Sequence, residues 1–276
     1  MVQPASVSGT VPLMPREQGC ATSWICLRGL MREQRHWGAF PALFRQQFPQ
    51  DTLILADLPG FGTEYASGSP ATIKGITERL RRRWQSSLLQ QPVYLLTLSL
   101  GGMVAIDWAS RYPQQIAGIV LMNSSLSNFS PFYRRLSPAA YLPLLKLLLW
   151  PRDPWHQEAA ILSLTSHLHP DDPELLAHWV HYARQYPARR LDILRQLLAA
   201  LSYRAPKLPP PVPIMMLGGL QDRLVSPSCS ESIATHWLLP LHCHALAGHD
   251  LTLDAGDWVC EQIAAWLNEA LPSTAG

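Results

Sequence analysis

The chain has 276 residues, of which 47% are hydrophobic and 15% are charged, and its formal net charge is +2 at pH 7. This composition excludes a disordered chain, and the nearly balanced charge gives no indication of nucleic-acid binding. The five cysteines lack the paired spacing of zinc or redox motifs, and we find no signal peptide and no apolar segment of transmembrane length. We therefore expect a cytoplasmic protein with no stable membrane insertion.

Short apolar runs that stop at turn signals predict buried strands. In chain order they are residues 23–27, 52–56, 93–98, 117–122, 212–217 and 241–246. Segments with helical periodicity lie among them, for example 73–89 and 102–111, and an apolar stripe over 258–267 predicts a final helix. This alternation predicts an α/β fold with a mostly parallel sheet and helices on both faces.

The alternation is interrupted once, where leucine-rich helical segments are separated by many prolines. We interpret residues 128–205 as an inserted helical lid, and residues 1–127 and 206–276 as the core. A proline-rich run over 206–213 then leads back into a strand, as proline does in extended linkers.

Ser99 lies in the sequence Thr97-Leu98-Ser99-Leu100-Gly101-Gly102, between a predicted strand and a predicted helix. Strand, tight turn and helix form the context of a nucleophile elbow, in which small residues allow close packing around a strained serine. A serine hydroxyl is a poor nucleophile until a base accepts its proton. The motif therefore predicts a histidine and a carboxylate further along the chain.

His249 follows the last predicted strand and Asp222 follows the strand before it. The chain order Ser99, Asp222, His249 is the order of this kind of catalytic triad, and all three residues follow strands whose carboxyl ends meet at one edge of the sheet. His242 and His244 are weaker alternatives for the base because they lie within a predicted strand.

The oxyanion that forms during acyl transfer needs two hydrogen-bond donors. We expect the backbone amides of Leu100, next to the nucleophile, and of Leu30, in the loop after the first strand. Several histidines of the lid lack accompanying carboxylates or cysteines, so we predict neither a metal nor a cofactor.

These motifs, together with Leu27-Arg28-Gly29-Leu30 before Trp37, the segment Asp57-Leu58-Pro59-Gly60-Phe61-Gly62, and Gly248 before His249, resemble the α/β-hydrolase superfamily. The chain is most similar to small bacterial carboxylesterases with a helical lid, a group that includes the pimeloyl-acyl-carrier-protein methyl ester esterases. The family usually has histidine where this chain has Arg28, and glycine where it has Thr97.

An apolar part of the lid contains Phe129, Phe132 and Trp150, and these are our candidates for substrate contacts together with Arg28. Such a surface above the strand ends predicts a pocket for an apolar acyl group. Three arginines flank the same part of the lid: Arg134, Arg135 and Arg152. They are candidate contacts for an acyl carrier protein. Such a carrier is the alternative partner to a small-molecule ester or acyl thioester.

The sequence thus predicts a serine hydrolase that cleaves a carboxylic ester or thioester through an acyl-enzyme. Two alternatives remain open. One is an acyltransferase that uses the same triad, and the other is a catalytically silent binding protein on the same fold.

Overall fold

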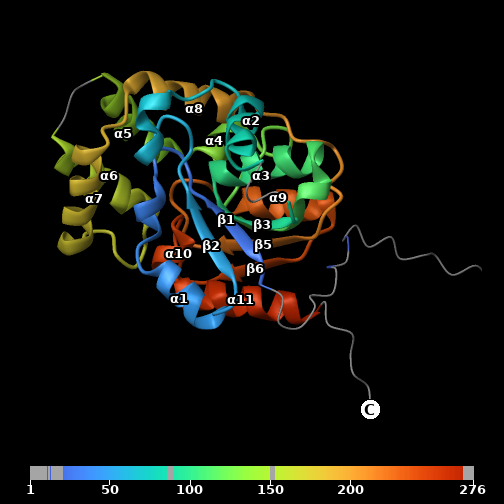
Figure 1. Ribbon diagram of the computed structural model, residues 1–276. Coiled ribbons are helices and arrows are strands. Elements are labelled where there is room, and N and C mark those ends of the chain that lie inside the picture. Colours follow the sequence, from blue (N-terminus) through green and yellow to red (C-terminus); the bar gives the residue numbers. More distant parts are fainter. Residues whose placement is uncertain (1–10, 12, 14–20, 86–89, 150–152, 270–276) are drawn as a thin grey trace, which may run out of the picture.

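A computed structural model describes residues 11, 13, 21–85, 90–149 and 153–269 of the chain. Its centre is a parallel sheet in which the described strands lie in the order β2-β1-β3-β4-β5-β6 (Figure 1). The strands are β1 (Ser23–Leu27), β2 (Thr52–Ala56), β3 (Val93–Leu98), β4 (Ile116–Met122), β5 (Ile214–Gly219) and β6 (Leu241–His244). The predicted α/β architecture is confirmed, and the first three strands have the predicted bounds.

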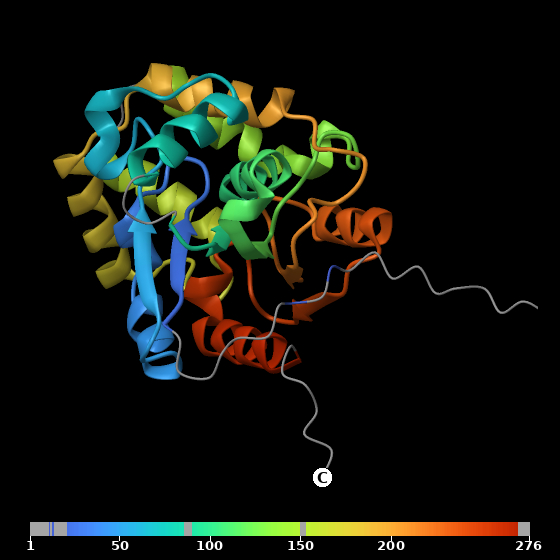
Figure 2. The same cartoon turned by 45° about the vertical axis from the view of Figure 1, so that its right-hand side comes forward.

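Helices cover both faces of the sheet, as expected. One face carries α1 (Phe40–Gln47) and α11 (Gly256–Glu269), and the other carries α2 (Ile73–Trp84), α3 (Leu100–Arg111) and α9 (Ser228–Trp237). In Figure 1, α1 and α11 lie below the sheet and α2 and α3 above it, and the turned view of Figure 2 preserves this arrangement. The short α10 (Leu251–Asp254) connects the last strand to α11.

The two cores result from the alternation of side chains along each strand. In β1, Ile25 and Leu27 belong to the core under α2 and α3, whereas Trp24 and Cys26 belong to the core over α1 and α11. Because both faces are buried, the strand is apolar at every position after Ser23, a pattern typical of parallel sheets.

Five described helices lie between β4 and β5 in the chain: α4 (Phe132–Arg135), α5 (Pro138–Leu149), α6 (Pro154–Thr165), α7 (Pro173–Gln185) and α8 (Arg190–Ser202). We call them the inserted helices. Several of the prolines that punctuate this part of the sequence begin a helix, a position where the missing N–H costs no intrahelical bond. A small separate core of Leu162, Leu176, Trp179 and Val180 holds α6 against α7.

Thr97, where the family usually has glycine, fits inside the sheet. Its side chain is fully buried in β3, and its hydroxyl donates a hydrogen bond of 2.9 Å to the Val120 carbonyl oxygen of β4. The bulkier residue therefore links two central strands directly before the turn that carries Ser99.

Candidate active site

Ser99 lies between β3 and α3 with a strained backbone. Its φ of 56° and ψ of −116° place it in a region that residues other than glycine rarely adopt. The Ser99 amide donates to the Met122 carbonyl oxygen at 2.9 Å, and the Ser124 hydroxyl donates to the Ser99 carbonyl oxygen at 2.6 Å. These contacts to β4 and the residues after it hold the turn in its strained conformation.

Two glycines let the loop after β1 approach this turn closely. A Cβ on Gly101 would lie 2.4 Å from the Leu27 carbonyl oxygen, and a Cβ on Gly29 would lie 3.2 Å from the Cβ of Ser99. Leu30 follows directly in this loop, and it lines the same cavity as Ser99 and Leu100. Leu100 is the first residue of α3, where a backbone N–H has no partner within the helix.

His249 and Asp222 form a buried pair. The His249 Nδ1 lies 2.7 Å from the Asp222 Oδ2, and both side chains are almost completely inaccessible to solvent. The other oxygen of Asp222 accepts hydrogen bonds from the amides of Leu224 at 2.9 Å and Val225 at 2.8 Å. These amides fix the carboxylate, so the turn after β5 determines where the imidazole ring points.

Asn123, to which the sequence alone gave no such role, connects the loop that carries His249 to the end of β5, just before the turn that carries Asp222. It follows β4 and is buried, with a positive φ of 44°. Its side-chain amide donates to the carbonyl oxygens of Gly248 at 3.0 Å and His249 at 2.8 Å, and its side-chain oxygen accepts from the Gly219 amide at 2.9 Å. The sequence feature that could have pointed to Asn123 is a polar residue directly after a buried strand.

Arg28 lies after β1 and forms a two-point ion pair with Asp250, the residue after His249. The distances are 3.0 Å and 2.5 Å, and both side chains are 2% exposed. The guanidinium also lies 5.0 Å from the centre of the Trp37 ring. Burial raises the pKa of Asp250, but the charge and hydrogen bonds of Arg28 outweigh it, and the net shift is downward. Asp250 is therefore an ionised partner of Arg28.

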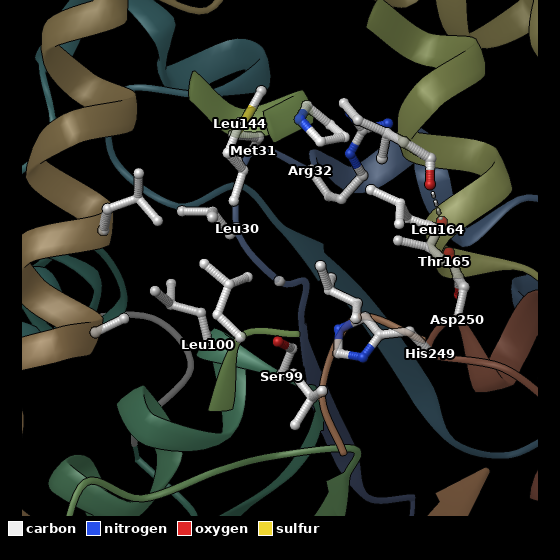
Figure 3. A pocket seen from close by; sticks show the side chains of 18 of the residues that line it. Leu30, Met31, Arg32, Ser99, Leu100, Leu144, Leu164, Thr165, His249 and Asp250 are labelled. Carbon is white, nitrogen blue, oxygen red and sulfur yellow. Dashed lines mark hydrogen bonds between the residues drawn. The ribbon is translucent and has the colours of Figure 1, made fainter. Parts of the chain in front are cut away.

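A cavity of about 180 Å³ opens beside Ser99 and His249. Figure 3 shows Ser99, Leu100 and His249 on one side of it, with Leu144 and Leu164 of the inserted helices across from them. Its lining is mostly apolar, and about half of the lining residues lie between β4 and β5, including Leu136, Pro143, Leu144, Ala160, Ile161, Leu164, Leu197 and Leu201. The cavity therefore suits an aliphatic group next to the serine hydroxyl.

The candidate substrate contacts that the sequence suggested do not all lie at the cavity. Arg28 lines the cavity, but its guanidinium is held by Asp250. Phe129 stacks on His236 at 4.5 Å and Phe132 is 64% exposed, and neither lines the cavity. Trp150 lies outside the described residues. His242 and His244, the alternatives for the base, lie on β6 and do not line the cavity.

The inserted helices are attached to the site through buried polar contacts. Arg32, in the loop after β1, pairs with Glu158 of α6 at 2.7 Å, and its guanidinium lies 5.0 Å from the Trp179 ring of α7. The Asp250 amide donates to the Thr165 carbonyl oxygen at the end of α6 at 2.7 Å. The inserted helices, which form the roof of the cavity, are thus attached to two of the loops that line its opposite side.

Within the described part of the chain, no group of three or more histidine, cysteine, aspartate or glutamate side chains is arranged to hold a metal ion. No helix in that part is long and apolar enough to cross a membrane.

A family model described as the alpha/beta hydrolase family matches residues 24–262, which is well over half of the chain. The protein belongs to this family. Solved structures agree on the fold: a thermophilic esterase from Thermogutta terrifontis aligns with a TM-score of 0.72 and 19% identity over 91% of both chains. The enol-lactonase from Burkholderia xenovorans LB400 aligns with a TM-score of 0.71 and 15% identity over 92% of this chain and 94% of its own.

Curated relatives match at higher identity but over shorter regions. The pimeloyl-[acyl-carrier protein] methyl ester esterase of Xylella fastidiosa (strain M12) is 30% identical over 87 residues, which are 32% of this chain and 31% of the relative. The biotin biosynthesis bifunctional protein BioHC of Cellvibrio japonicus is 30% identical over 190 residues, which are 65% of this chain and 34% of the relative. The matched region thus spans about a third of each relative.

We expect the Arg28–Asp250 pair to dominate the stability of this region. Asp250→Asn should lower the free energy of unfolding by about 3 to 5 kcal/mol, because it leaves the Arg28 charge buried without compensation. The double variant Arg28→Met with Asp250→Asn should lose clearly less than the sum of the two single variants. Urea denaturation of all four proteins measures this difference, and additive losses would contradict the coupling.

The pH dependence follows from the lowered pKa of Asp250. A carboxylate whose folded-state pKa is lowered stabilises the protein above its unfolded-state pKa, and this contribution disappears as the pH falls through the folded-state value. The difference between wild type and Asp250→Asn should therefore be constant from pH 5 to pH 8 and shrink only in strong acid, roughly below pH 4.

Proposed function

We propose that the protein is a serine esterase that cleaves a carboxylic ester or thioester through an acyl-enzyme, with Ser99 as nucleophile, His249 as base and Asp222 as the acid of the triad. The observation that carries this proposal is the buried 2.7 Å contact between His249 and Asp222, in a loop that shares one cavity with the strained Ser99. The family of the chain supports a hydrolase activity of this kind.

The reaction follows from these positions. The Ser99 oxygen attacks the carbonyl carbon while His249 accepts the hydroxyl proton, and Asp222 stabilises the resulting imidazolium. The carbon–oxygen or carbon–sulfur bond to the leaving group then breaks, and His249 returns the proton to the departing alcohol or thiol. A water molecule, activated by His249 in the same way, hydrolyses the acyl-enzyme and releases the acid.

We assign the oxyanion hole to the amides of Leu30 and Leu100. Both residues line the cavity beside Ser99, and Gly29 and Gly101 permit the close approach of the two segments. Preorganised amides stabilise the developing negative charge, and the loss of one such donor costs about 3 kcal/mol in other hydrolases. Here the ion pair of Arg28 with Asp250 fixes the loop that carries the Leu30 amide.

We propose that residues 128–205 act as the lid that selects the acyl group, since their helices supply about half of the apolar cavity lining. A small-molecule ester or acyl thioester is the proposed substrate. An acyl carrier protein stays an alternative partner, and a relative whose name specifies such a substrate supports it. Arg134 is exposed and available for a carrier, whereas Arg135 is buried, and Arg152 lies outside the described residues. The free cysteines at positions 26, 229, 243 and 260 are consistent with the proposed cytoplasmic location.

The proposal is tested by labelling with a fluorophosphonate probe and by a hydrolysis screen over esters, acyl thioesters and amides, with Ser99→Ala as control. We expect stoichiometric labelling of the wild type, none of Ser99→Ala, and hydrolysis of esters or thioesters. Product that forms only when an alcohol or thiol acceptor is added would indicate an acyltransferase. A wild type that is neither labelled nor active would indicate a binding protein.

Ser99→Ala and His249→Ala should each lower kcat by roughly four to six orders of magnitude, because nucleophile and base act in one step. The double variant should be little slower than either single variant. Steady-state kinetics on an activated ester measure all three, and multiplicative losses in the double variant would show that the two residues do not share a step.

Asp222→Asn should lose roughly four orders of magnitude in kcat, by analogy with the triad aspartate of serine proteases, because its contact with the His249 Nδ1 fixes the tautomer of the ring. Asp250→Asn should lose far less rate, since its carboxylate faces Arg28. Rates are compared at a temperature where circular dichroism shows both variants folded. The opposite ranking would reassign the acid.

Acyl chains of medium length should be hydrolysed with a higher kcat/KM than acetate. Each methylene buried in the apolar cavity contributes about 0.8 kcal/mol of binding, which is roughly a fourfold gain per carbon until the cavity is full. p-Nitrophenyl esters from acetate to decanoate measure the trend. An equal kcat/KM across the series would contradict the assignment of the cavity to the acyl group.

A further inference from the structure

The cavity beside Ser99 contains more positive than negative charge. Four lysine or arginine side chains line it: Arg28, Arg32, Arg135 and Lys146. Among the described lining residues, Asp250 carries the only carboxylate, and it is paired with Arg28. Arg32 is paired with Glu158, which lies outside the cavity lining. Neither Arg135 nor Lys146 forms an ion pair with a described carboxylate, so their two charges remain uncompensated.

Arg135 is the more unusual of the two because it is buried, with an exposed fraction of 8%. One terminal nitrogen donates to the Ala200 carbonyl oxygen at 2.6 Å, and the buried Nε has no hydrogen-bond partner in the described structure. Burial lowers the pKa of this guanidinium, and the Cys229 thiol only partly opposes that shift. A buried cation without a counter-ion is costly, so its place in the cavity wall calls for an explanation.

Part of the explanation is structural, because Ala200 lies in the last turn of α8, where free carbonyl oxygens accept hydrogen bonds and attract positive charge. That contact uses one N–H group of the five in a guanidinium. It leaves the Nε without a partner, and it requires neither the full charge nor the fork of donors that distinguishes arginine from simpler donors.

A ligand with anionic oxygens would satisfy the remaining donors. Guanidinium groups bind carboxylates and phosphates with short, paired hydrogen bonds, and Lys146 of α5 adds a second cation at the same cavity. The other residues that line the cavity are largely aliphatic. A substrate that matches both features has a scissile ester at one end, an apolar spacer, and a negatively charged group at the other end.

We propose that Arg135, together with Lys146, forms a subsite for a carboxylate or phosphate group of the substrate, so that the enzyme prefers esters with a distal anionic group to neutral esters of the same length. This proposal rests on the proposed esterase function. It adds that the selectivity comes from a cation in the roof of the cavity rather than from the depth of the cavity alone.

Two matched pairs of esters test the preference. The p-nitrophenyl monoester of adipate carries a carboxylate at the far end of its acyl chain, and p-nitrophenyl hexanoate is its neutral counterpart with the same number of acyl carbons. The second pair, 2-phosphoethyl and 2-hydroxyethyl hexanoate, places the charge on the alcohol side. We expect the wild type to favour the charged member of one pair at least tenfold in kcat/KM, and the pair concerned shows which side carries the anion.

Arg135→Met should lower this charged-to-neutral ratio at least tenfold, mainly through KM, and Arg135→Lys should retain part of it. Arg190, an exposed arginine of the inserted helix α8 outside the cavity lining, gives the matched control, since Arg190→Met removes the same charge away from the cavity. Its ratio should equal that of the wild type. If Arg135→Met fails to fold, Lys146→Met and Arg135→Lys supply the comparison, and both should lower the ratio.

A binding measurement separates this proposal from the esterase proposal. Calorimetry should detect adipate or 2-phosphoethanol binding to Ser99→Ala, and at least tenfold weaker binding to Ser99→Ala with Arg135→Met. This result stands even if no ester is hydrolysed, in which case only the esterase proposal fails. An unchanged ratio together with equal binding to both proteins overturns the subsite and leaves Arg135 as a cap for α8.

Discussion

The buried ion pair between Arg28 and Asp250 joins two loops that are 222 positions apart in the chain. One loop follows β1 and carries Leu30, and the other follows β6 and carries His249. A pair of charges removed from water must be held in good geometry, because either charge alone would be strongly destabilising. This ion pair therefore fixes the position of His249 relative to the loop after β1, because separating the two groups would leave both charges without compensation.

The remaining polar contacts of the site extend this connection. Asn123, directly after β4, joins the loop that carries His249 to the end of β5, and Asp222 fixes the ring of His249. Parallel strands bring their carboxyl ends to one edge of the sheet, and that edge alone does not determine how the loops lie against each other. In this protein a few buried side chains with several hydrogen bonds each supply that information.

Much of this arrangement could be predicted from the sequence because its signals are local. A strand of a parallel sheet is mostly apolar and ends at a turn, so the strands of residues 23–27, 52–56 and 93–98 were predicted with their observed bounds. Ser99, Asp222 and His249 each follow a strand of this sheet, and the shared edge of the sheet accounts for the cavity that contains Ser99 and His249. The bounds of β5 and β6 were less accurate, since the proline run before β5 and the histidines of β6 blur the pattern.

Contacts between distant parts of the chain could not be predicted in this way. Nothing near Arg28 or Asp250 in the sequence indicates that they pair, and Asn123 resembles an ordinary loop residue. Arg134 and Arg135 are neighbours in a helix of four residues, which is too short for a hydrophobic period to show that one faces water and the other is buried. Phe129 illustrates the same limit, because its stacking partner His236 belongs to α9.

The contact between the Asp250 amide and the Thr165 carbonyl oxygen is made by backbone atoms alone. Such a bond does not depend on the identity of either side chain, so mutation can exchange the leucines of the cavity wall while α6 remains attached beside His249. Replacing the inserted helices by those of another protein is more demanding, because the end of α6 must still present a carbonyl oxygen to the Asp250 amide. The segment that ends α6 is thus the part of the insertion that a designer of new specificities should carry over unchanged.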